Sequence, residues 1–150
     1  QFIQADAASR RGLIQALGRM QTLLEPVGSE IQWHGGSDVT EITNTSSGLR
    51  IVVAAPEGID RYLEVHFPFV RAFQVMDEGD MLEYWQTPLT TGHALYKVAS
   101  GGWRERAAGQ FLHVTASLDT MQEWLVVSEC LCVSVVSAYV PHVREFGDAA

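Results

Sequence analysis

Three side chains able to exchange protons lie at alternate positions of one predicted strand. Tyr62, Glu64 and His66 alternate with apolar residues, so on an extended backbone they project to the same face. A carboxylate beside an imidazole fixes the tautomer of the ring and raises its basicity, as a general base requires. Glu64 and His66 are therefore the candidate acid/base pair. The same alternation is also expected of a strand with one face in solvent, which needs no catalysis.

The spacing of histidine and cysteine gives little support for a metal site. The five histidines form no HxH, HxxxH or HExxH pattern. His66 and His113 are the pair best placed to converge, because both lie in predicted strands. Cys130 and Cys132 project to one face of a strand but are poorly oriented for a bridge, so we expect two reduced thiols. We predict no metal ion and no cofactor.

Aromatic residues define a second candidate site. Each of the four tryptophans lies in or beside a predicted strand. A curved sheet with aromatic side chains on its concave side forms an apolar pocket, in which a few polar groups orient a ligand. We therefore predict a ligand pocket that includes Tyr62, Trp85, Trp103 and His113. Aromatic side chains are also expected where they fill a core or cover a subunit interface.

Charge and missing motifs argue against several classes of function. Ten basic residues against eighteen acidic ones give a net charge of −8, and Lys97 is the single lysine. Nucleic acid and anionic membranes attract clustered lysine and arginine, so neither is an expected partner. The sequence has no P-loop, GxGxxG or GxSxG motif, which argues against a kinase, a dinucleotide enzyme and a serine hydrolase. The acidity suits a basic protein partner.

The elements that would position these residues begin with a helix. Apolar residues recur at helical spacing from Leu13 to Leu24, and Pro26 ends the pattern. Small side chains on one side of this helix would allow close approach of the sheet or of a second subunit. They are Ala8, Gly12 and Ala16.

The rest of the chain alternates as β-strands do. Val39 to Thr45 and Leu49 to Ala55 flank a Ser-Ser-Gly turn and predict a hairpin. From 61 to 75 the alternation continues, which predicts one long strand or two nearly collinear ones with Pro68 at an edge or bulge. Trp103 to Ala107 and Gln110 to Ala116 are further predicted strands.

These elements predict a single α+β domain over residues 1–150. Short turns separate the strands, so we expect a mainly antiparallel, strongly bent sheet, a meander that could close toward a barrel. The N-terminal amphipathic helix would pack on it. The bend would create the concave face on which the predicted pocket lies.

Three classes of function remain open. The first, favoured by small size and missing motifs, is a non-catalytic binding domain for a small apolar ligand on the concave face or for a protein partner. The second is an enzyme whose acid/base site is built around Glu64 and His66. The third is an acidic accessory protein of the immunity or antitoxin kind.

Self-association and location are further expectations. The small-residue row and the run from Val133 to Val140 could each form the interface of a homodimer. No signal-peptide pattern and no apolar stretch of ~18 residues is present, so we expect a cytoplasmic protein.

Overall fold

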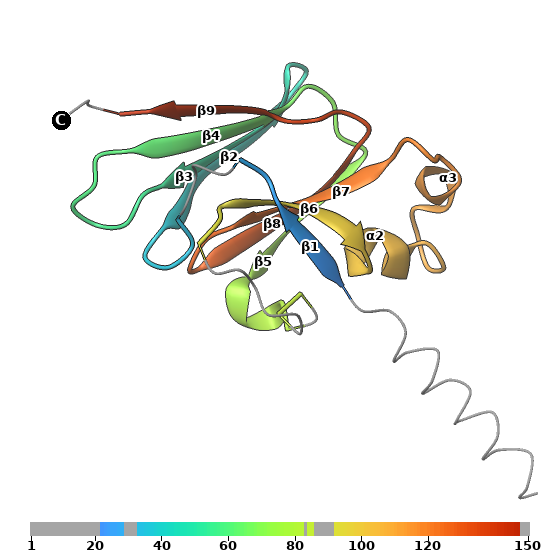
Figure 1. Cartoon of the computed structure of the whole chain (residues 1–150). Coiled ribbons are helices and arrows are strands. Elements are labelled where there is room, and N and C mark those ends of the chain that lie inside the picture. Colours follow the sequence, from blue (N-terminus) through green and yellow to red (C-terminus); the bar gives the residue numbers. More distant parts are fainter. Residues whose placement is uncertain (1–21, 29–32, 83, 86–91, 148–150) are drawn as a thin grey trace, which may run out of the picture.

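The structure is a computed structural model that describes residues 22–28, 33–82, 84–85 and 92–147. The described strands form two antiparallel sheets that pack face to face (Figure 1). Sheet A has the order β1 (Leu23–Pro26), β6 (Leu95–Ser100), β7 (Gln122–Val127), β8 (Leu131–Ser137) and β5 (Ala72–Asp77). Sheet B has the order β2 (Asp38–Thr45), β3 (Gly48–Ala54), β4 (Tyr62–Phe67) and β9 (His142–Phe146).

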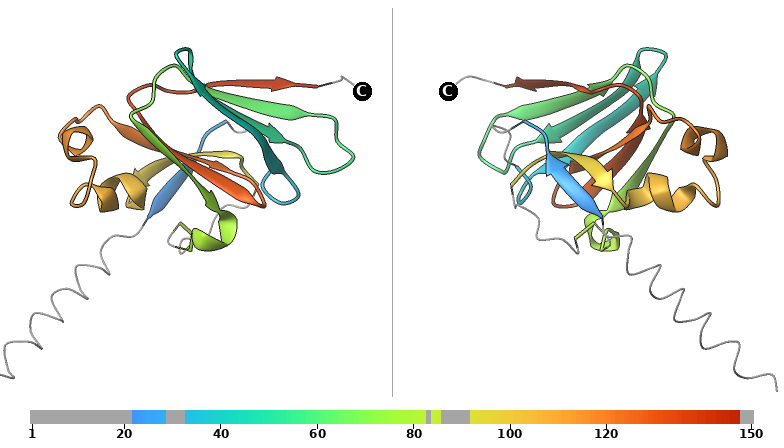
Figure 2. Two further views of the ribbon diagram at one scale, coloured as in Figure 1. Left: turned by 180° about the vertical axis from the view of Figure 1, so that it is seen from behind. Right: turned by 45° about the vertical axis from the view of Figure 1, so that its right-hand side comes forward.

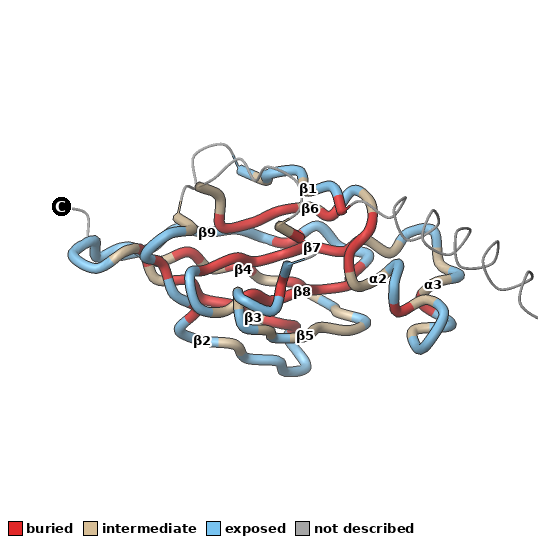
Figure 3. Tube along the Cα trace, turned by 90° about the horizontal axis from the view of Figure 1, so that it is seen from below, coloured by how far each residue is buried: buried red, intermediate tan, exposed pale blue. Residues whose placement is uncertain are grey.

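The central strands of sheet A are buried on both faces. On β7, Trp124 and Val126 pack toward sheet B, whereas Leu125 and Val127 belong to a second apolar cluster on the opposite face. A strand covered on both sides has a continuous apolar sequence instead of an alternating one. This explains the valine-rich runs of β7 and β8, which are buried along most of their length (Figure 3).

The short helices η1 (Glu78–Asp80) and α2 (Gly102–Ala107) lie on the side of sheet A that faces away from sheet B. A further short helix, α3 (His113–Ala116), lies beside α2 at one end of the molecule (Figures 1 and 2). The second apolar cluster lies on that side of sheet A. Its buried members are Met81, Tyr84, Tyr96, Val98, Leu125, Val127 and Cys132.

The predicted fold class, an N-terminal helix packed on one bent sheet, is wrong. The described residues form two sheets and no closed barrel, and their longest helix, α2, has six residues. Leu23 and Leu24, which the helical pattern included, lie in β1 and pair with β6. Pairing with a neighbouring strand has overridden the local spacing. The rest of that predicted helix, with its row of small residues, lies outside the described residues.

The predicted long strand over 61–75 is divided between the sheets. β4 ends at Phe67, and residues 68–71 cross from sheet B to sheet A, where β5 begins (Figure 2). In β5, Phe73 packs against the core between the sheets and Met76 against the second apolar cluster, so the alternation there does not mark one buried face. The predicted hairpin is confirmed as β2 and β3. The segments 103–107 and 113–116, predicted as strands, are helical instead.

The described part of the chain contains no helix both long and apolar enough to span a membrane.

Candidate functional site

The candidate acid/base residues lie on the outer face of sheet B, where each has a neighbour of its own. The Glu64 carboxylate accepts hydrogen bonds from Arg50 Nε at 2.6 Å and from Arg144 Nη2 at 3.2 Å. The hydrogen bond from Arg50 is the main cause that lowers the pKa of Glu64. His66 Nε2 lies 2.9 Å from the Ser47 carbonyl oxygen. Glu64 is thus engaged by the two guanidinium groups and His66 by a backbone carbonyl.

Pairing of β4 with β9 completes this face. The His66 ring stacks near that of His142 with centroids 6.5 Å apart, and the Tyr62 ring stacks on Phe146 at 5.2 Å. The alternation therefore does place Tyr62 and His66 on one face with Glu64. On this face Glu64 forms ion pairs, and the rings of Tyr62 and His66 stack near the rings of Phe146 and His142.

The four residues of the predicted ligand pocket are not brought together. Tyr62 lies on the outer face of sheet B, whereas Trp85 lies beside η1, where its Nε1 donates to the Glu78 carbonyl at 3.0 Å. Trp103 lies at the start of α2 and His113 at the start of α3. Two of the four thus lie on the neighbouring short helices, where the structure has two open hollows.

The first hollow lies between α3 and the crossover from β4 to β5. It has a volume of about 450 Å³ and is open to solvent. Arg71 Nε donates to the hydroxyl of buried Thr115 at 3.2 Å and so ties the crossover to α3. Its lining residues are Phe69, Val70, Arg71, Leu112, His113, Val114 and Thr115.

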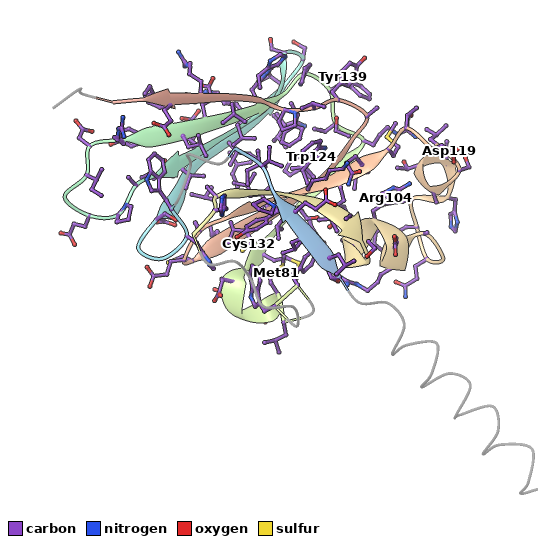
Figure 4. All side chains as sticks on the ribbon, in the orientation of Figure 1. Met81, Arg104, Asp119, Trp124, Cys132 and Tyr139 are labelled. Carbon is purple, nitrogen blue, oxygen red and sulfur yellow. The ribbon has the colours of Figure 1, made fainter. Side chains whose placement is uncertain are left out.

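The second hollow lies between α2 and α3. It has a volume of about 390 Å³ and is lined by Arg104, Glu105, Ala108 and Ala116. The Arg104 Nε atom is buried and has no hydrogen-bond partner among the described residues. Figure 4 places Arg104 beside these two helices. We call the two hollows and the side chains at their rim the α3 site.

A buried glutamate holds α2 in place. The Glu123 carboxylate accepts hydrogen bonds from Tyr84 Oη at 2.5 Å, from Ser134 Oγ at 2.7 Å, and from the backbone N–H groups of Trp103 at 3.2 Å and Arg104 at 2.8 Å. It therefore satisfies backbone donors in the first turn of α2, as a capping side chain does, but from a strand of sheet A. Burial, followed by the nearby charge of Glu123, raises the pKa of Tyr84.

Sequence reasoning missed this cluster and the α3 site. An acid inside the apolar run of β7 was the one available signal for Glu123, because a buried charge needs specific partners. Arg71 and Thr115 are 44 residues apart, and nothing in their local patterns marks them as neighbours.

Three apolar side chains on or next to the segments that line the hollows are exposed. Phe69, Phe111 and Val114 are 54%, 48% and 65% exposed. Leu112, which leads into α3, is the sole non-glycine residue in the described part of the chain with a positive φ, at 62°. Such a conformation is costly for a branched side chain and recurs at functional sites. The site thus combines exposed apolar groups, open hollows and a strained backbone position.

Comparison with known protein families, with curated proteins and with solved structures finds no match.

Proposed function

We propose that this chain is a binding domain that docks a partner polypeptide at the α3 site. The observation that carries the proposal is that two apolar residues lining the first hollow, Phe69 and Val114, are exposed, and that exposed Phe111 comes just before the segment that forms α3. Exposed apolar patches with polar residues at their rim are typical of interaction sites. A polypeptide suits this site better than a small apolar ligand, because Phe111 lies outside both hollows and a ligand inside them would leave it exposed.

The test is a selection of binding peptides from a random display library, followed by mapping on the full chain. We expect selected peptides to shift the backbone amide resonances of 69–71 and 111–116. Val114→Glu should abolish their binding, whereas Ile59→Glu should not, since Ile59 is 49% exposed on the turn between β3 and β4. Peptides that map to β9 or to the outer face of sheet B, or a selection that yields none, would reject the proposal.

A further inference from the structure

The two arginines that line the hollows differ from three arginines on or beside sheet B in their acidic partners. On or beside sheet B, Arg50, Arg61 and Arg144 each form an ion pair with a glutamate. Arg71 and Arg104 form none among the described residues. The difference matters because a guanidinium without a carboxylate partner in the protein can pair with a carboxylate that a ligand supplies.

We infer that the segment bound at the α3 site is acidic as well as apolar, and that one of its carboxylates pairs with Arg104. This inference rests on the proposed function, since it specifies the chemistry of the polypeptide docked there. A guanidinium presents donors in a planar fork that matches a carboxylate. The small side chains of Ala108 and Ala116 leave the second hollow open beside that fork.

The backbone of Arg104 is fixed before any ligand arrives. Its N–H donates to Glu123 Oε2 at 2.8 Å, so its side chain starts from an anchored helix. Glu105 is the one carboxylate that lines the second hollow, and its Oε2 accepts from the backbone N–H of Gly101 at 2.9 Å. Glu105 is therefore engaged at the start of α2, while Arg104 keeps its donor for another acceptor.

A second cation lies across α3 from Arg104. Arg71 uses its Nε for Thr115, and its terminal nitrogens form no hydrogen bond with the described residues. His113 lines the same hollow. An extended segment that crosses α3 can therefore place one acidic side chain toward each arginine and an apolar side chain between them, against Phe69 and Val114.

Local charge at the site differs from that of the chain. Acidic residues outnumber basic ones by 18 to 10 overall, yet over 69–71 and 101–120 three arginines stand against two acids. A chain with a net charge of −8 repels acidic ligands in general. The balance of charge over these two segments is therefore opposite to that of the chain.

The experiment measures fluorescence anisotropy of labelled short peptides on the full chain. The probes are a peptide that alternates Glu with Leu, one that alternates Lys with Leu, and one that alternates Glu with Ser. We expect the Glu/Leu peptide to bind at least tenfold more tightly than either of the others, and more weakly as salt rises. Arg104→Gln should weaken its binding about tenfold, which is 1.4 kcal/mol. The control Arg61→Gln removes an exposed arginine beside sheet B and should have no effect.

Each other outcome overturns the inference. Equal binding of the Glu/Leu and Lys/Leu peptides, or no change on Arg104→Gln, would show that charge is not recognised. Tight binding of the Glu/Ser peptide would show that apolar groups are not needed, and competition by octanoate at equal concentration would identify a small carboxylate as the occupant. If none of the three binds, the inference fails, while the display selection still decides the proposed function. Arg104→Gln should not lower the thermal midpoint of the wild type, because the buried Nε that it removes forms no hydrogen bond with the described residues.

Discussion

Two glutamates on the outer faces of the two sheets are held in opposite ways. Glu64, on sheet B, has a side chain that is 17% exposed and lies between the guanidinium groups of Arg50 and Arg144. Glu123, on sheet A, is 2% exposed and accepts from two hydroxyls and two backbone N–H groups. Water can replace a lost partner at Glu64. It cannot readily do so at Glu123, where every donor is enclosed by protein.

This difference connects stability to the candidate site. The ion pairs of sheet B engage its arginines with glutamates, so that face has its charges satisfied. On sheet A the buried carboxylate is satisfied without any guanidinium, and it anchors the helix that carries Arg104. Arg104 is thereby left beside the second hollow with its Nε unpaired among the described residues. Burial of one charged group, Glu123, thus fixes the helix that carries another, Arg104.

The largest expected effect is that of removing the Glu123 carboxylate. Glu123→Ala removes the acceptor of the Tyr84 and Ser134 hydroxyls and of the Arg104 N–H, while the Trp103 N–H keeps Tyr84 Oη as an acceptor at 2.8 Å. We expect the free energy of unfolding to fall by about 3–5 kcal/mol, since buried unsatisfied polar groups are costly. Glu64→Ala is the matched control and should cost less than about 1 kcal/mol. Urea unfolding curves measure the free energy of unfolding of both variants. Equal losses of stability would contradict the difference between the two glutamates.

The reactivity of the two cysteines measures how well the outer side of sheet A is shielded from solvent. Cys132 belongs to the apolar cluster on the outer side of sheet A, and burial raises the pKa of its thiol to about 12, whereas Cys130 is exposed. Because the thiolate is the reactive form, we expect alkylation of Cys132 to be at least about 100-fold slower than that of Cys130. Mass spectrometry over time measures both rates, with Cys130→Ser to isolate the buried thiol. Glu123→Ala should accelerate modification of Cys132, and similar rates for the two wild-type thiols would refute a closed face.

A methyl group added next to Glu123 tests how closely α2 approaches it. Gly102 has φ +78°, and a Cβ there would lie 2.5 Å from Glu123 Oε2 and 2.9 Å from Val98 Cγ1. Gly102→Ala should therefore lower stability by about 2 kcal/mol, from backbone strain and displacement of the carboxylate. Gly109→Ala is the control, because its Cβ would meet no atom within 4 Å, and its effect should stay within about 0.5 kcal/mol. The melting temperatures of the two variants measure this difference in stability. A Gly102→Ala variant as stable as the wild type would contradict the prediction.

The smallest expected effect is the pH dependence of Glu64. Its pKa in the folded state is lowered, chiefly by the hydrogen bond from Arg50, so its contribution is present above the unfolded pKa of about 4.3 and is lost as pH falls through the folded pKa. Glu64→Gln should cost less than about 1 kcal/mol at pH 7. At a pH below the folded-state pKa of Glu64, the substitution should leave the free energy of unfolding unchanged. Unfolding curves of the wild type and of Glu64→Gln across this pH range give the difference in the free energy of unfolding. A difference that increases toward acid pH would contradict the prediction.

Some of the fold follows from local pattern. The hairpin of β2 and β3 was predictable because alternation and a Ser-Ser-Gly turn both indicate it. The short helices were not, since Trp103 to Ala107 follows a Ser-Gly-Gly turn that indicates a hairpin, and the capping acceptor of α2 is Glu123, about 20 residues away. The alternation over 61–75 also continued across a change of sheet. An alternating sequence indicates an extended strand. It does not indicate which of the two sheets the strand belongs to.

The sequence by itself determined that the chain is rich in antiparallel strands, that Tyr62, Glu64 and His66 share a face, and that no motif names a reaction. These features depend on neighbouring residues, and the two-residue period of a strand is enough to establish them. Only the tertiary structure decided which arginines are neutralised and which are not. The pairing of Glu64 with Arg50 and Arg144, and the placing of Arg104 by Glu123, join residues distant in sequence. Ion pairing and burial depend on those three-dimensional neighbours, so local patterning could not predict them.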